Sequence, residues 1–141
     1  IWRRIEGGPP NNVPAGSSAS FAIVTTGRHI VDYGNDRVQM GTVGVNVDLD
    51  PPTISVLTPP ETGTATYVLG SKVNANYSCS DSVSPVLDCV GSVPNDSPLA
   101  TSQVTSGGSA YSMFVLAHDS VGRPWQTAGN YYLRCADATP C

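Results

Sequence analysis

The stretch Val73-Asn74-Ala75-Asn76-Tyr77-Ser78-Cys79 decides the fold class, because apolar and polar side chains alternate along it without a break. Valine, alanine, tyrosine and cysteine fall on one face, and asparagine and serine fall on the other. This period of two is typical of a half-buried antiparallel strand. Shorter runs of the same kind surround the stretch, and apolar residues nowhere recur at helical spacing for more than one turn. We therefore predict an all-β chain.

The composition supports strands and turns and argues against two classes of partner. The 141 residues include 14 glycines and 12 prolines but only seven lysines and arginines, with a net charge of −4. A nucleic-acid surface needs clustered basic side chains, which this chain lacks, so we expect no nucleic-acid partner. No run approaches the roughly 18 apolar residues of a spanning helix, so we expect no membrane span.

The segment Asp48-Leu49-Asp50-Pro51-Pro52 reads as a junction between two modules. Before it, period-two patterns predict three strands, at residues 19–23, 29–33 and 43–49. After it, patterns of the same kind predict further strands, at residues 53–57, 67–69, 73–79, around Cys89, weakly at 102–105, at 110–119 and at 131–135. About seven short strands in roughly 100 residues are typical of a two-sheet sandwich.

An internal repeat relates the two sides of this junction. Val13-Pro14 recurs as Val93-Pro94, and the segment 24–27 recurs as 104–107, both at an offset of 80 residues. Residues 1–50 thus look like the last three strands of a module whose complete copy occupies residues 51–141. Because three strands in about 50 residues bury little apolar surface, we expect residues 1–50 to need completion by other strands. A preceding part of a longer protein, the second module or a neighbouring chain could supply them.

Several short motifs resemble the tandem immunoglobulin-like and hyalin-repeat-like modules of secreted bacterial proteins. They are Asp50-Pro51-Pro52-Thr53-Ile54, Tyr67-Val68-Leu69-Gly70, Tyr77-Ser78-Cys79-Ser80-Asp81, Cys89 and Ala117-His118-Asp119-Ser120-Val121-Gly122. The resemblance covers roughly residues 50–136 and implies an immunoglobulin-like antiparallel β-sandwich. It also implies a Cys79–Cys89 disulfide. Modules of this kind serve as spacers, adhesive units and enzyme appendages, so fold alone does not select a function.

The four cysteines indicate an extracellular or cell-surface protein, where disulfides persist. Sequons at Asn76 and Asn95 agree with that setting. A redox or metal site at Cys79 and Cys89 is the alternative to a disulfide, but their spacing is not that of a Cys-x-x-Cys motif. For the second pair, Cys135 and Cys141, a local bridge is the first of the possible connectivities.

Four aspartates raise a calcium hypothesis, since carboxylates near a module junction offer the hard oxygen ligands that Ca²⁺ prefers. The residues are Asp48, Asp50, Asp81 and Asp119. The alternative is that they are solvated turn residues that accept local backbone hydrogen bonds. Apart from calcium, the sequence predicts no cofactor.

Two aromatic residues, Trp125 and Tyr132, could stack on sugar rings if they lie on a face or loop. The histidines, His29 and His118, have no nucleophile at motif spacing, and no pair of carboxylates is specified for glycoside hydrolysis. We therefore expect no enzyme. The sequence favours a structural or adhesive module of an extracellular or fibrous assembly, whose partners are copies of the same chain or adjacent modules. An accessory carbohydrate-binding module with surface glycans as partners is the alternative.

Overall fold

The structure is a computed structural model that describes residues 2–5, 11–12, 20–35, 38–103 and 110–136. All regular structure within these ranges is β-strand, which confirms the predicted all-β class. In the same ranges, no helix has the length and apolar character needed to cross a membrane. The chain forms two compact units, residues 1–50 and 51–141, with the boundary between Asp50 and Pro51.

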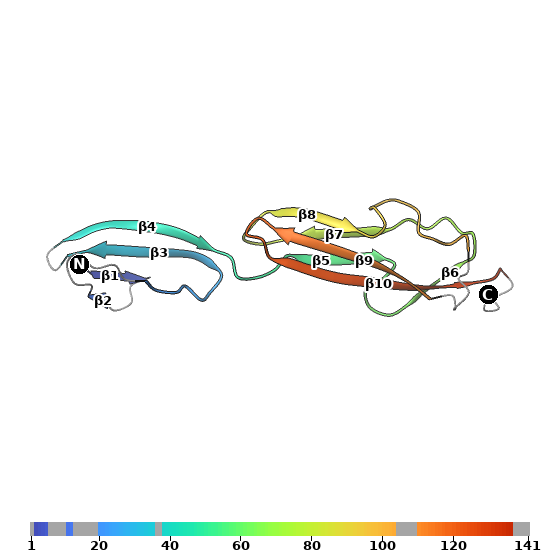
Figure 1. Cartoon of the computed structure of the whole chain (residues 1–141), viewed down its shortest axis with the longest axis horizontal. Coiled ribbons are helices and arrows are strands. Elements are labelled where there is room, and N and C mark those ends of the chain that lie inside the picture. Colours follow the sequence, from blue (N-terminus) through green and yellow to red (C-terminus); the bar gives the residue numbers. More distant parts are fainter. Residues whose placement is uncertain (1, 6–10, 13–19, 36–37, 104–109, 137–141) are drawn as a thin grey trace. The chain divides into compact units, whose positions relative to one another are not determined.

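The first unit is a four-stranded antiparallel sheet in the order β2-β1-β3-β4 (Figure 1). Its strands are β1 (Trp2–Ile5), β2 (Asn11–Asn12), β3 (Gly27–Gly34) and β4 (Gln39–Val47). The sequence predicted three strands, one of them at residues 19–23. Residue 19 lies outside the described residues, and residues 20–25 form no strand. Phe21 is 41% exposed there, so the apolar alternation in this segment does not reflect burial in a sheet.

One face of the first sheet is only partly covered. His29 and Val31 of β3 are buried on it, whereas Tyr33 of the same face is 44% exposed. On β4, Val43 pairs with Val31 and is 49% exposed. The ring of Tyr33 lies over its cross-strand partner Gly41, which has no side chain to obstruct it. This sheet therefore leaves part of its apolar face in contact with solvent.

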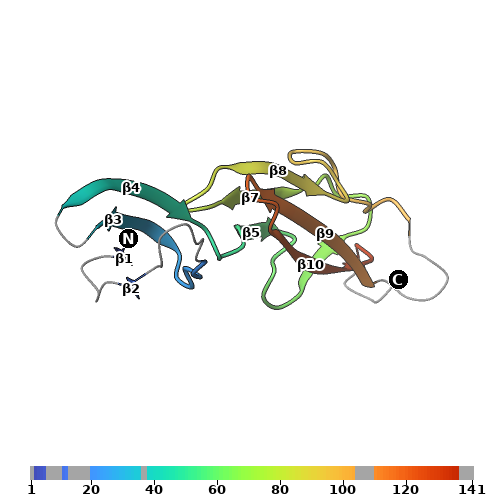
Figure 2. The same ribbon diagram turned by 60° about the vertical axis from the view of Figure 1, so that its left-hand side comes forward.

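The second unit contains two sheets that pack face to face (Figures 1 and 2). The larger sheet has the order β6-β10-β9-β8, and the smaller pairs β5 with β7. The strands are β5 (Thr53–Thr58), β6 (Ala65–Val68), β7 (Asn76–Ser80), β8 (Val86–Gly91), β9 (Ala110–Asp119) and β10 (Pro124–Arg134). β10 is longer than the predicted strand at 131–135, and it pairs antiparallel with β9 and parallel with β6. Residues 102–103 form no strand, and residues 104–105 lie outside the described residues.

Alternating side chains from both sheets fill the core of the second unit. β5 contributes Ile54 and Val56, and β9 contributes Met113, Val115 and Ala117, all nearly inaccessible to solvent. The remaining buried apolar members are Ala75, Tyr77, Leu99, Tyr131 and Leu133. Each buried aliphatic or aromatic side chain contributes roughly 1.5–3 kcal/mol relative to an exposed one, so this core accounts for a stable unit.

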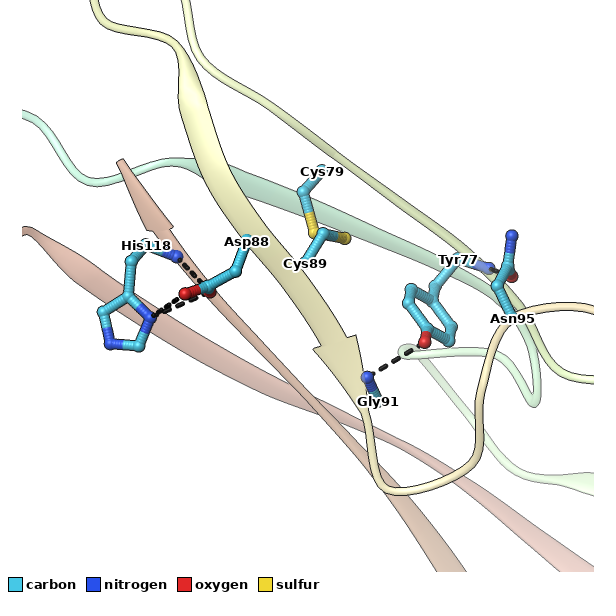
Figure 3. The surroundings of a disulfide bond; sticks show 7 residues. All are labelled: Tyr77, Cys79, Asp88, Cys89, Gly91, Asn95 and His118. Carbon is cyan, nitrogen blue, oxygen red and sulfur yellow. Dashed lines mark hydrogen bonds and ion pairs between the residues drawn. A yellow bond between two sulfur atoms is a disulfide. The ribbon is translucent and has the colours of Figure 1, made fainter. Parts of the chain in front are cut away.

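A disulfide joins the two sheets of the second unit, since Cys79 lies on β7 and Cys89 on β8 (Figure 3). This bond matches the pairing that the resemblance implied. Nearby, the hydroxyl oxygen of Tyr77 accepts a hydrogen bond from the Gly91 N–H at 2.9 Å. The Tyr77 N–H donates to the Asn95 side-chain oxygen, also at 2.9 Å. The inner face of β7 is thus fixed to β8 and to the loop that follows it.

Candidate functional site

Among the described residues of the second unit, the most deeply buried acidic side chain is that of Asp119, at the end of β9. It is fully buried, and its Oδ1 accepts the N–H groups of Val121 at 2.9 Å and Arg123 at 2.8 Å. These bonds shape the β9–β10 turn, in which Gly122 adopts a positive φ of 86° that favours glycine. The second oxygen, Oδ2, is buried, and none of the residues that the structure describes forms a hydrogen bond with it. Because buried polar atoms normally have a hydrogen-bond partner, this oxygen is a candidate for binding a ligand.

A second carboxylate, that of Asp81, lies beside Asp119. One oxygen of each side chain lies within 4.8 Å of the other. The Asp81 Oδ1 accepts the N–H groups of Val83 at 2.8 Å and Ser84 at 2.9 Å, and these bonds hold the pKa of its carboxyl below the usual range. Asp81 is therefore an anion at neutral pH. Two of the four predicted calcium ligands thus come together within the second unit.

The other two predicted calcium ligands, Asp48 and Asp50, belong to the first unit. The Asp48 Oδ1 accepts a hydrogen bond from the Asp50 N–H at 3.1 Å. This bond has the form of the local turn that the sequence offered as the alternative to metal binding. Their part in calcium binding stays a prediction.

The edge strand β4 is the second candidate feature. It pairs with β3 on one side, and among the described residues no strand pairs with its other side. Its sequence, Gln-Met-Gly-Thr-Val-Gly-Val-Asn-Val, contains no charged residue and no proline. Natural edge strands usually carry such residues because they prevent pairing with other chains. This nine-residue edge has backbone groups available for an additional strand and lacks that protection.

The two predicted stacking residues are both on β10 and both about half exposed, Trp125 at 49% and Tyr132 at 47%. They are seven positions apart, so they lie about 23 Å from each other along an extended strand and point to opposite faces. The structure therefore does not bring them together as one stacking platform. Stacking on a sugar by either residue alone stays a prediction.

The histidines have different surroundings. His29 is buried, and its Nε2 lies 2.8 Å from the carbonyl oxygen of Thr25, to which it donates. His118 is exposed and forms a hydrogen bond with Asp88, whose Oδ1 lies 2.9 Å from Nδ1 (Figure 3). Sequence reasoning missed this pair because the two residues are 30 positions apart, and only the β8–β9 register places them opposite each other.

Burial also raises the pKa of two tyrosines in the second unit. Desolvation raises the pKa of Tyr67 and Tyr131, whose rings lie 5.5 Å apart, and Tyr111 stacks on Tyr131 at 5.1 Å. The Tyr131 hydroxyl donates to the Ala100 carbonyl oxygen at 3.1 Å. The phenols of Tyr67 and Tyr131 therefore remain protonated at neutral pH, and both rings pack in the core of the unit.

Cys135 is also disulfide-bonded. The partner that the sequence predicts for it, Cys141, lies outside the described residues.

Comparison with known proteins gives no relative from which a role could be carried over. The chain matches no protein-family model, and no curated protein or solved structure is significantly similar to it. The class that the structure itself defines is an all-β chain with two units, the second a disulfide-linked sandwich of two sheets.

Proposed function

We propose that this chain is a structural or adhesive module of an extracellular assembly, and that it works by adding β-strands from other copies to its first unit. The second unit would be a complete immunoglobulin-like sandwich of the hyalin-repeat-like kind, and the first unit an incomplete one. The observation that carries the proposal is the uncharged edge of β4.

Backbone pairing at this edge would be accompanied by side-chain contacts on the partly covered face of the first sheet. Val43 and Tyr33 expose 49% and 44% of their surface on the face where His29 and Val31 are buried. A strand that adds to β4 extends this face and places its own side chains beside those of β4, such as Val43. The edge of β4 and the partly exposed face lie on the same unit, and a strand from another molecule could pair with the one and pack on the other.

Two arrangements follow from the symmetry of the contact. If β4 pairs with β4 of a second copy, the contact is isologous and the assembly stops at a dimer. If β4 pairs with a different strand of the next copy, the contact is heterologous and the chains can form an open fibre. The fibrous role that we propose uses the second arrangement.

Sedimentation velocity of the full chain over a range of concentrations tests the proposal. We expect the mass to rise with concentration beyond that of a dimer. Met40→Lys and Val43→Lys place a charge on exposed positions of β4 and should each weaken association at least tenfold. Val121→Lys is the matched control, since Val121 is 57% exposed in the β9–β10 turn and far from β4 in sequence. A chain that stays monomeric, or equal association of all three variants, would remove the proposal.

The alternative function, an accessory carbohydrate-binding module, has one supporting observation, the half-exposed indole of Trp125. Glycan-array binding that disappears in Trp125→Ala, while the mass of the chain in solution stays unchanged, would favour this alternative over strand addition.

A further inference from the structure

We propose that Asp81 and Asp119 form a Ca²⁺ site on the second unit. The proposal does not depend on strand addition by β4. It begins from the Asp119 Oδ2, which is fully inaccessible to solvent and has no hydrogen-bond partner within the described part of the chain. The other oxygen of the same carboxylate already accepts two backbone N–H groups. A carboxylate buried in this way is stable only when its remaining oxygen also has a partner.

The neighbouring group at this position is a second anion, which makes the arrangement unfavourable without a cation. One oxygen of Asp81 lies within 4.8 Å of one oxygen of Asp119. Two like charges at this distance repel each other, and the repulsion is strong where burial lowers the dielectric constant. A cation between the two carboxylates replaces that repulsion with two attractions.

The chemistry of the donors favours a hard divalent cation, and their spacing is compatible with Ca²⁺. Both side chains offer carboxylate oxygens, the hard ligands that Ca²⁺ and Mg²⁺ prefer. Because Ca²⁺ binds oxygen at about 2.3–2.6 Å, one ion can bridge two oxygens up to about 5 Å apart, whereas Mg²⁺ at about 2.0–2.1 Å reaches only about 4.2 Å. The upper limit of 4.8 Å lies within the span of Ca²⁺. Water and backbone carbonyls would complete its six to eight ligands.

A backbone hydrogen bond holds together the two loops that carry these aspartates. The Ser120 N–H donates to the Pro85 carbonyl oxygen at 2.8 Å, which joins the β9–β10 turn to the β7–β8 loop (Figure 1). Each aspartate is fixed by two bonds to its own loop. A site formed in this way requires little reorganisation on binding.

Calcium titration of the chelator-treated full chain tests the proposal by isothermal calorimetry and by thermal unfolding. We expect CaCl₂ to release or absorb heat and to raise the Tm, and MgCl₂ at the same concentration to raise it less. Asp81→Asn retains a side-chain oxygen for the Val83 and Ser84 N–H groups, so this variant should fold and should bind Ca²⁺ at least tenfold more weakly. Asp119→Asn should have the same effect on binding.

Asp96→Asn is the matched control, since Asp96 is exposed and has a positive φ of 59° that asparagine also adopts. It should bind Ca²⁺ as the unaltered chain does. No heat and no change in Tm with Ca²⁺, or equal binding by Asp81→Asn and Asp96→Asn, would overturn the proposal. If Asp119→Asn fails to fold, Asp81→Asn decides the question alone. The variants Asp48→Asn and Asp50→Asn show in the same titration whether these two aspartates, which the sequence also predicted as ligands, contribute to Ca²⁺ binding.

Discussion

Gly91→Ala should destabilise the second unit because the position has no room for a methyl group. A Cβ at Gly91 would lie 2.6 Å from the Val93 carbonyl oxygen, 2.8 Å from Tyr77 Cε1 and 2.9 Å from Tyr77 Cζ. Carbon atoms in comfortable contact are about 3.5–4.0 Å apart, so the ring or the backbone must move. The Tyr77 ring is buried in the core, and its hydroxyl oxygen accepts the Gly91 N–H (Figure 3). Moving the ring therefore also weakens a hydrogen bond.

The size of the effect follows from three contributions. Overpacking in a closed core costs about 1–3 kcal/mol. Loss of the hydrogen bond costs about 1 kcal/mol more. Alanine has less backbone entropy to lose in a strand than glycine, which offsets about 0.5–1 kcal/mol. We expect a net loss of about 1–3 kcal/mol in the free energy of unfolding.

Urea unfolding followed by NMR signals of the second unit measures this change without interference from residues 1–50. Gly44→Ala in β4, followed through signals of the first unit, is the control, since its new Cβ would meet only the flexible end of Arg28 at 3.4 Å and should leave the stability of that unit nearly unchanged. In a Tyr77→Phe background, where no hydrogen bond holds the ring, Gly91→Ala should cost about 1 kcal/mol less. Unfolding of Gly91→Ala at the same urea concentration as the unaltered chain would refute the close contact, and an unchanged cost in the Tyr77→Phe background would refute the coupling.

Three further outcomes are expected. Replacing both Cys79 and Cys89 by serine should lower the free energy of unfolding by roughly 3 kcal/mol, the value that the chain-entropy model gives for so short a loop. Urea titration of the oxidised chain and of the variant measures this loss, and equal midpoints would contradict it. Met113→Ala should cost about 2–5 kcal/mol, because the side chain is 1% exposed and leaves a cavity; a loss below 1 kcal/mol in the same assay would contradict the packing. Hydrogen bonding lowers the pKa of Asp81 on folding, so the stability it provides is present above its unfolded pKa of about 3.9 and is lost as the pH falls through its lower folded pKa. A carboxyl-carbon NMR titration should give a midpoint below the unfolded value, and a midpoint at or above it would refute the conclusion that the two hydrogen bonds outweigh repulsion from Asp119.

The burial of the stretch 73–79 could be predicted from its sequence, but its pairing could not. Its side chains alternate between the interior and solvent as the pattern indicated. The regular ladder with β5 nevertheless begins only at Asn76. Before that point the backbone bonds to the segment 96–99, where the Ala75 N–H donates to Ser97 and the Leu99 N–H donates to Val73. Period-two patterning reports which face is buried, and it carries no information about which backbone lies alongside.

In residues 20–25 the alternating pattern predicted a strand that the structure does not form. Apolar side chains alternate there too, at positions 19, 21 and 23, yet Phe21 is 41% exposed. The first sheet instead pairs β3 with β1, which comes from the opening segment of the chain. Tertiary pairing can override a short local pattern because the ladder with β1 provides the backbone bonds that the segment 20–25 would otherwise supply.

The sequence could predict the type of residue in the candidate calcium site, but it could not predict that one aspartate oxygen is buried there without a hydrogen-bond partner among the described residues. A set of aspartates near the junction suggested oxygen ligands, and the structure brings Asp81 and Asp119 together. The orphaned Asp119 Oδ2 depends on the turn that occupies the other oxygen, and no spacing in the sequence reveals such an atom. The Asp88–His118 pair was hidden for a similar reason, because a bulge between Val86 and Asp88 sets its register.

The parallel pairing of β6 with β10 has a mechanical consequence. Four residues at the end of β10, Tyr131 to Arg134, pair with β6, while the strand also pairs along its length with β9. If tension is applied along the chain, a pull on the end of β10 acts parallel to these strands and perpendicular to their hydrogen bonds, so the bonds share the force in shear. A hairpin pulled open from its ends would instead lose them one at a time. The second unit is therefore expected to resist stretching, and single-molecule force spectroscopy can measure the force at which β10 detaches.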